Sequence, residues 1–158
     1  MKQKVRKIHS FSQIQTLFIS VFIFIFIALL FVGSKQVFAD SPPNTPSLDS
    51  PANGATNQSL RPALKTTATD PYSDYLRYKI QVCTDPSMIT GYQTFDQTVS
   101  QTGWSGQNTQ SNTAYTSGTQ ATYTLQTNLT PNTTYYWRSY AIDPGGTNTW
   151  SNTQTPYS

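Results

Sequence analysis

Residues 129–143 (LTPNTTYYWRSYAID) constrain the fold of this chain more than any other stretch. Pro131 presets φ and Asn132 tolerates turn geometry, so a tight corner is expected there. After the corner, large and small side chains alternate with a period of two, as in a strand with one buried face. A tyrosine at this place can direct its hydroxyl back to the chain just upstream. The stretch therefore predicts a corner of a β-sandwich, closed by Tyr135.

The same alternation recurs along the chain, and no segment after residue 40 has a helical period. The clearest case is 75–84, where Leu76, Tyr78 and Ile80 alternate with polar residues. By the same alternation, we expect Cys83 on the solvent-exposed face of this strand. Abundant threonine and tyrosine also favour strands. We expect seven strands, at 46–51, 60–70, 75–84, 92–99, 122–129, 135–142 and 148–157.

The N-terminal residues 1–39 differ from the rest. A basic tip precedes an apolar run at 17–32, and the segment ends on Val37, Phe38 and Ala39. This is the pattern of a secretory signal peptide cut between Ala39 and Asp40. The alternative is an uncleaved membrane anchor, but the apolar run is shorter than the ~20 residues that span a bilayer. Residues 40–46 (DSPPNTP) are expected to form a stiff, unpacked linker, and 47–158 one domain.

Charge and composition exclude several functions. Five of the ten basic residues lie in the leader, so the mature part carries five against seven aspartates, a net charge of −2. Nucleic-acid binding is therefore not expected. The single histidine, His9, also lies in the leader, glutamate is absent, and Cys83 is the only cysteine. A Ser-His-Asp or Cys-His unit and a zinc site of His and Cys are thereby excluded from the mature chain.

Several segments together resemble the fibronectin type III family, in particular its bacterial exported members. The corner supplies L-x-P-x-T-x-Y through Leu129, Pro131, Thr133 and Tyr135. The other segments are PSLDSP at 46–51, ATDP at 68–71, YKIQV at 78–82, YYWR at 135–138, GG at 145–146 and WS at 150–151. The resemblance covers about residues 43–158. It implies an all-β, immunoglobulin-like sandwich of two sheets that binds or spaces rather than catalyses, with Trp137 and Trp150 as core anchors.

This chain departs from the family pattern in two places. Residues 100–120 are longer and more polar than the usual connection, and we expect a partly ordered loop there. The chain also stops at Ser158, at the edge of the last expected strand. Either that strand is short or the sandwich is truncated within a longer modular protein, and we favour the second interpretation.

Three connections should meet at one pole of the sandwich, at 70–74, 100–120 and 143–148. Trp104 and Tyr115 in the longest one could form an exposed platform for a sugar ring or a protein. The alternative is that Trp104 covers the core edge and Tyr115 begins a strand. Asp70, Asp74 and Asp143 also meet there, but ordinary turn chemistry is preferred over calcium. We therefore expect no metal and no cofactor.

The sequence thus predicts a non-catalytic module, secreted or at the cell surface. It would be a spacer or a protein-binding, adhesive unit, with proteins or cell-surface glycans as partners. We expect the protein to contact a membrane only through the N-terminal segment. The alternative is a carbohydrate-binding module that uses Trp104 and Tyr115. A third hypothesis is a structural subunit that keeps its N-terminal segment as a membrane anchor.

Overall fold

The computed structural model describes residues 39–158, so the expected signal peptide lies outside the described residues except for Ala39. No helix in the described part is long and apolar enough to cross a membrane. Asp40–Ser158 forms one compact unit. Its strands are β1 (Ser47–Ser50), β2 (Ala63–Thr67), β3 (Arg77–Cys83), β4 (Gln93–Asp96), β5 (Trp104–Ser105), β6 (Ala121–Thr124) and β7 (Tyr136–Ile142).

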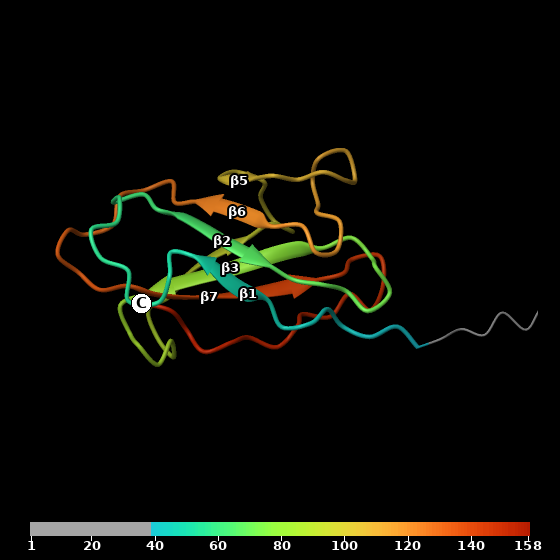
Figure 1. Ribbon diagram of the computed structural model, residues 1–158, viewed down its shortest axis with the longest axis horizontal. Helices are drawn as coiled ribbons and strands as arrows, with labels where there is room; N and C mark the ends of the chain where they lie inside the picture. The colour runs from blue at the N-terminus through green and yellow to red at the C-terminus, as the bar shows by residue number, and fades with distance from the viewer. Residues whose placement is uncertain (1–38) are drawn as a thin grey trace, which may run out of the picture. The chain divides into compact units, whose positions relative to one another are not determined.

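The strands form two sheets, in the orders β1-β2-β6-β5 and β4-β3-β7 (Figure 1). All pairings are antiparallel. The longest pairing joins β3 to β7, with Arg77 opposite Ile142 and Cys83 opposite Tyr136. The expected all-β sandwich of two sheets is therefore confirmed.

The core lies between the sheets because each central strand buries every second side chain. Leu64 and Thr66 of β2 face it, as do Tyr78 and Ile80 of β3, and each is almost inaccessible to solvent. The sheets also meet through aromatic rings: Phe95 of β4 stacks on Tyr123 of β6 with ring centroids 4.5 Å apart. The predicted buried side chains of β3, among them Tyr78 and Ile80, are buried, but toward its end Gln81 and Cys83 on the opposite face are buried as well.

The strands expected at 60–70 and 122–129 are shorter in the structure, at Ala63–Thr67 and Ala121–Thr124. Two other expected strands differ for a visible reason. Strand β4 ends at Asp96 rather than at 99, because the Asp96 carboxylate accepts hydrogen bonds from the backbone N–H and hydroxyl of Thr98 and closes a turn. The expected strand at 148–157 is not formed. That segment meets β7 only in part: Ser151 Oγ accepts a bond from Ala141 N–H, and Tyr157 forms an isolated bridge to Trp137. A side chain thus replaces a backbone acceptor, which interrupts the ladder.

Residues 100–120 are better ordered than a polar loop would suggest. They contain the short strand β5, which pairs with β6. Tyr115 and Leu76 exchange two backbone hydrogen bonds of 2.8 and 2.9 Å, which extends β3 by one bridge. The buried side chain of Gln97 accepts a bond from Tyr78 N–H and donates one to the Thr113 carbonyl. Sequence composition gave no indication of this buried polar network.

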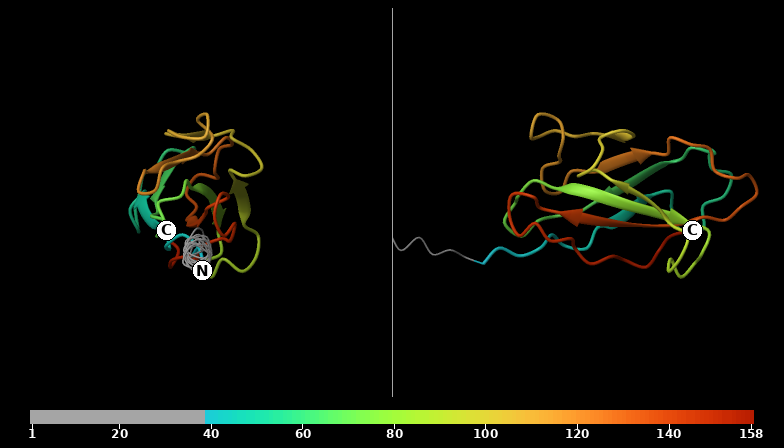
Figure 2. Two further views of the ribbon diagram at one scale, coloured as in Figure 1. Left: turned by 90° about the vertical axis from the view of Figure 1, so that its right-hand side faces the viewer. Right: turned by 180° about the vertical axis from the view of Figure 1, so that it is seen from behind.

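The two ends of the domain lie at opposite poles. The segment before β1 is bound to the pole beyond the end of β2, where Asn44 N–H donates to the Thr69 carbonyl at 2.9 Å. The C-terminus lies at the other pole, where Ser158 accepts a hydrogen bond from Gly54 N–H at 3.0 Å. Figures 1 and 2 show the cyan N-terminal segment and the C label at opposite ends of the strands. Residues 40–46 were expected to be unpacked, which is wrong, since Pro43 and Pro46 are buried.

Candidate functional site

The corner predicted from the sequence is formed. Tyr135 Oη accepts a hydrogen bond of 3.1 Å from the backbone N–H of Thr130, five residues upstream. Hydrogen bonding from Thr130 also lowers the pKa of the Tyr135 phenol. Leu129 and Tyr135 pack against the core, whereas Pro131 and Thr133 are exposed on the turn. These four residues therefore have a structural role in the corner.

Of the two possibilities for Trp104 and Tyr115, the exposed platform does not exist, and the alternative of rings that cover the core holds. Trp104 is 8% exposed and its ring packs on Tyr123 with centroids 5.0 Å apart. Tyr115 is 0% exposed and stacks edge-on against Tyr78 at 5.4 Å. Its hydroxyl donates to the Ser105 carbonyl at 2.9 Å, and burial raises its pKa. Because neither ring presents a face to solvent, the prediction of a sugar-stacking site on these residues is wrong, and both belong to the core.

The two tryptophans expected as core anchors have different places. Trp137 is 4% exposed and belongs to the core, as predicted. Trp150 was predicted there too, which is wrong: it is half-buried and lies over Lys79 on the outer face of the sheet β4-β3-β7. Its neighbour Ser151 is buried and is bonded to Ala141, so the alternation of the segment turns Ser151 inward and Trp150 outward.

Cations and aromatic rings alternate on this outer face. The ammonium of Lys79 lies 4.1 Å from the centre of the Trp150 ring and 4.5 Å from that of Tyr140. The guanidinium of Arg138 lies 5.6 Å from Tyr140 and 5.8 Å from Tyr92. Burial lowers the pKa of Lys79. We call these five residues the cation–aromatic row.

Cys83 was expected to face solvent, and this is also wrong. It is 4% exposed, and its Sγ lies 3.2 Å from the Asp85 carbonyl, to which it donates. The loop after β3 turns back over the sheet here, held by Asp85, whose carboxylate accepts from Ser87, Ile89 and Thr90. These bonds lower the pKa of Asp85 to about 2, and the bond from the Ser87 hydroxyl has the largest effect. A covered thiol of this kind is not an accessible nucleophile.

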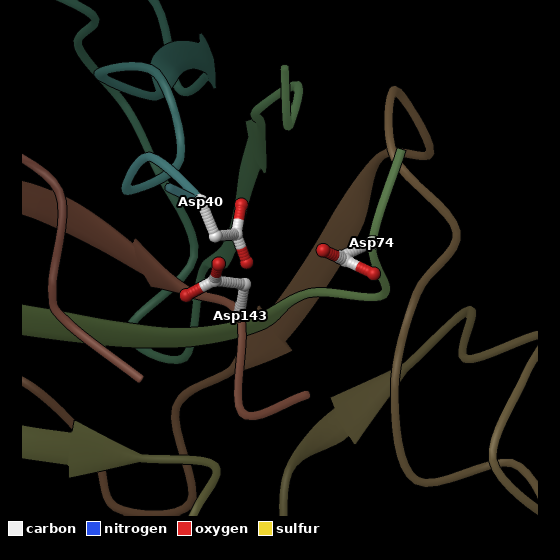
Figure 3. A group of neighbouring side chains, drawn as sticks. All are labelled: Asp40, Asp74 and Asp143. Carbon is white, nitrogen blue, oxygen red and sulfur yellow. The ribbon is translucent and has the colours of Figure 1, made fainter. Parts of the chain in front are cut away.

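Carboxylates cluster at the pole that holds the segment before β1, as the sequence predicted for Asp74 and Asp143, whereas Asp70 lies next to the cluster. Ligand oxygens of Asp40, Asp74 and Asp143 all lie within 4.8 Å of one another (Figure 3). Asp70 lies beside them, and its charge is among those that raise the pKa of Asp74. Asp40 was not predicted to join this group. No local pattern could have indicated it, because the contact depends on how the segment before β1 packs.

A cavity of about 560 Å³ lies at the opposite pole, between the loop after β1 and the corner. Its floor is apolar and includes Leu64, Val82, Leu125 and Trp137. None of its lining residues has a carboxylate, thiol, imidazole or basic side chain. The described residues therefore offer no acid–base pair or activated nucleophile in this cavity.

No protein-family model matches this chain, and no curated protein matches it. Among solved structures, it is similar to the PKD domain of an M14-like peptidase from Thermoplasmatales archaeon SCGC AB-540-F20. The identity is 23%, the match covers 73% of this chain and 91% of the other, and the TM-score is 0.44.

Proposed function

We propose that this protein is an exported, non-catalytic module of fibronectin type III type that acts as a spacer or protein-binding unit at the cell surface or in a secreted protein. The observation that carries the proposal is the position of the two ends of the domain. Asn44 is bonded to Thr69 beyond one end of β2, and Ser158 to Gly54 beyond its other end. When the chain enters a domain at one pole and leaves it at the other, the domain separates the segments before and after it by its own length.

The chemistry of the described residues agrees with this function. The core is made of aliphatic and aromatic side chains, and the cavity at the C-terminal pole has no catalytic group. For the protein-binding form of the proposal, the support is the cation–aromatic row, because tyrosine, tryptophan and arginine supply most binding energy at protein interfaces. Export would follow from cleavage after Ala39, in keeping with the basic and apolar pattern of residues 1–39.

The spacer function can be tested by fluorescence energy transfer between dyes on Ser41→Cys and Ser158→Cys. Cys83 is buried and does not compete for the dyes. We expect a narrow distance distribution, longer than that of a control pair on Ser41→Cys and Thr116→Cys, which share one pole. A broad distribution, or equal distances for the two pairs, would rule out a rigid spacer. Mass spectrometry of the exported protein should give an N-terminus at Asp40; an intact leader would instead support the membrane anchor.

A further inference from the structure

Three carboxylates from separate parts of the chain point toward one another at the N-terminal pole (Figure 3). Asp40 precedes β1, Asp74 lies in the loop before β3, and Asp143 directly follows β7. Asp143 is 0% exposed, and the other two are half-buried. Gathering three like charges in one place is unfavourable unless something of opposite charge offsets them.

Within residues 39–158, the donors that bond these carboxylates are all uncharged: Ser41 for Asp40, and Thr147 and Asn148 for Asp143. Asp143 is fixed in this position by its own turn, since its two oxygens accept bonds from Thr147 and Asn148. The repulsion is therefore built into the folded structure.

A second, separate observation concerns Asp70. This side chain is only 6% exposed, and its Oδ2 is buried with no hydrogen-bond partner. The other oxygen, Oδ1, accepts from the backbone N–H groups of Tyr72 and Asp74, so the carboxyl group lies within the turn that presents Asp74. A buried carboxylate oxygen without a donor costs about 1–3 kcal/mol or more, and such oxygens usually have a partner. A bound ion is a partner that this structure would accept.

The backbone around the cluster is shaped to let the carboxylates approach. A Cβ atom added at Gly146 would overlap the carboxylate oxygens of both Asp40 and Asp143. Only glycine leaves this space, so the two carboxylates occupy room that any other residue at this position would fill.

We propose that Asp40, Asp74 and Asp143, next to the buried carboxyl of Asp70, bind a calcium ion that clamps the segment before β1 to the loops before β3 and after β7. Oxygen-only donors select a hard cation. The oxygens span up to 4.8 Å. Three oxygens within this distance can reach one ion through calcium–oxygen bonds of about 2.3–2.6 Å, and calcium accepts a flexible, irregular set of ligands, whereas magnesium demands near-ideal octahedral geometry. The proposal holds whether or not the domain serves as a spacer.

The test uses the full chain, freed of metal with a chelator and then titrated with CaCl₂ while its thermal unfolding is followed. We expect a saturable rise of the melting temperature, by roughly 5 °C or more at one hundred times Kd. MgCl₂ should have a smaller effect, and NaCl of equal ionic strength almost none. Equilibrium dialysis with radioactive calcium should give about one ion per chain.

The variant Asp74→Asn separates an ion site from a merely acidic cluster. Without calcium it should raise the melting temperature, because it removes repulsion, and with calcium it should lose most of the rise seen for the parent. Asp40→Asn should do the same. Asp96→Asn, a carboxylate on β4 outside the cluster, should keep the full calcium effect. Equal melting temperatures in chelator and calcium, or the same response from Asp74→Asn and Asp96→Asn, would overturn the proposal, as would the absence of bound calcium in dialysis.

Discussion

At the scale of single residues, two tyrosine hydroxyls accept backbone N–H groups in different surroundings. Tyr78 Oη accepts from Ala68 at 3.0 Å in the core, whereas Tyr135 Oη accepts from Thr130 at an exposed corner. Tyr78→Phe leaves a buried N–H without a partner and should lower the free energy of unfolding by about 1–3 kcal/mol. Tyr135→Phe should cost only about 0.5–1 kcal/mol, because water can replace the lost acceptor.

Urea unfolding of the two variants measures this difference. Tyr92→Phe is the matched control, since the Tyr92 ring is 41% exposed and should change stability by less than about 0.5 kcal/mol. A loss for Tyr135→Phe as large as that for Tyr78→Phe would show that the corner, rather than the buried bond between the sheets, is the stronger link.

At the scale of elements, strand β5 depends on the glycine that precedes it. Gly103 has φ +85°, and an added Cβ would lie 2.6 Å from the Tyr123 ring and 2.9 Å from the Thr124 carbonyl oxygen. Gly91 also has positive φ, at +68°, but nothing within 4 Å. Both alanine variants incur the left-handed backbone cost of about 1–2 kcal/mol, and Gly103→Ala should lose a further 1–3 kcal/mol, roughly, by overpacking.

Denaturant unfolding of Gly103→Ala and Gly91→Ala compares the two sites directly. The difference between them reports the steric term alone, because the backbone strain is common to both. Equal losses would mean that β5 can move away from β6 without cost, and that Trp104 is not held in the core by this pairing.

At the scale of the whole molecule, one core joins both sheets, so the domain should unfold as a single cooperative unit. Trp104 reports on β5 in one sheet and Trp137 on β7 in the other, and both are buried. Replacing two of the three tryptophans by phenylalanine leaves one fluorescent probe per variant. In each variant, the fluorescence midpoint in urea should coincide with the midpoint from circular dichroism. Separate midpoints would show that the sheets unfold independently.

The amino-acid sequence by itself determined the class of fold and the core-facing side chains of the central strands, although not the additional burial of Gln81 and Cys83 at the end of β3. Alternation along β3 and β7 is a local property, and it is visible in Tyr78, Ile80 and Trp137 without any knowledge of their partners. The corner closed by Tyr135 is local as well, since donor and acceptor are five residues apart. The absence of histidine, of glutamate and of a second cysteine after residue 39 follows from composition alone.

Only the tertiary structure decided which aromatic rings are covered and which carboxylates meet. Trp104 and Tyr115 lie in a polar stretch, yet pairing with β6 and Leu76 buries them. Trp150 lies outside because its neighbour Ser151 faces the core beside Ala141. Asp40 reaches Asp143 through the packing of residues 40–46. Such contacts join segments far apart in the chain, and their energies depend on the complete packing of both sheets rather than on any local pattern.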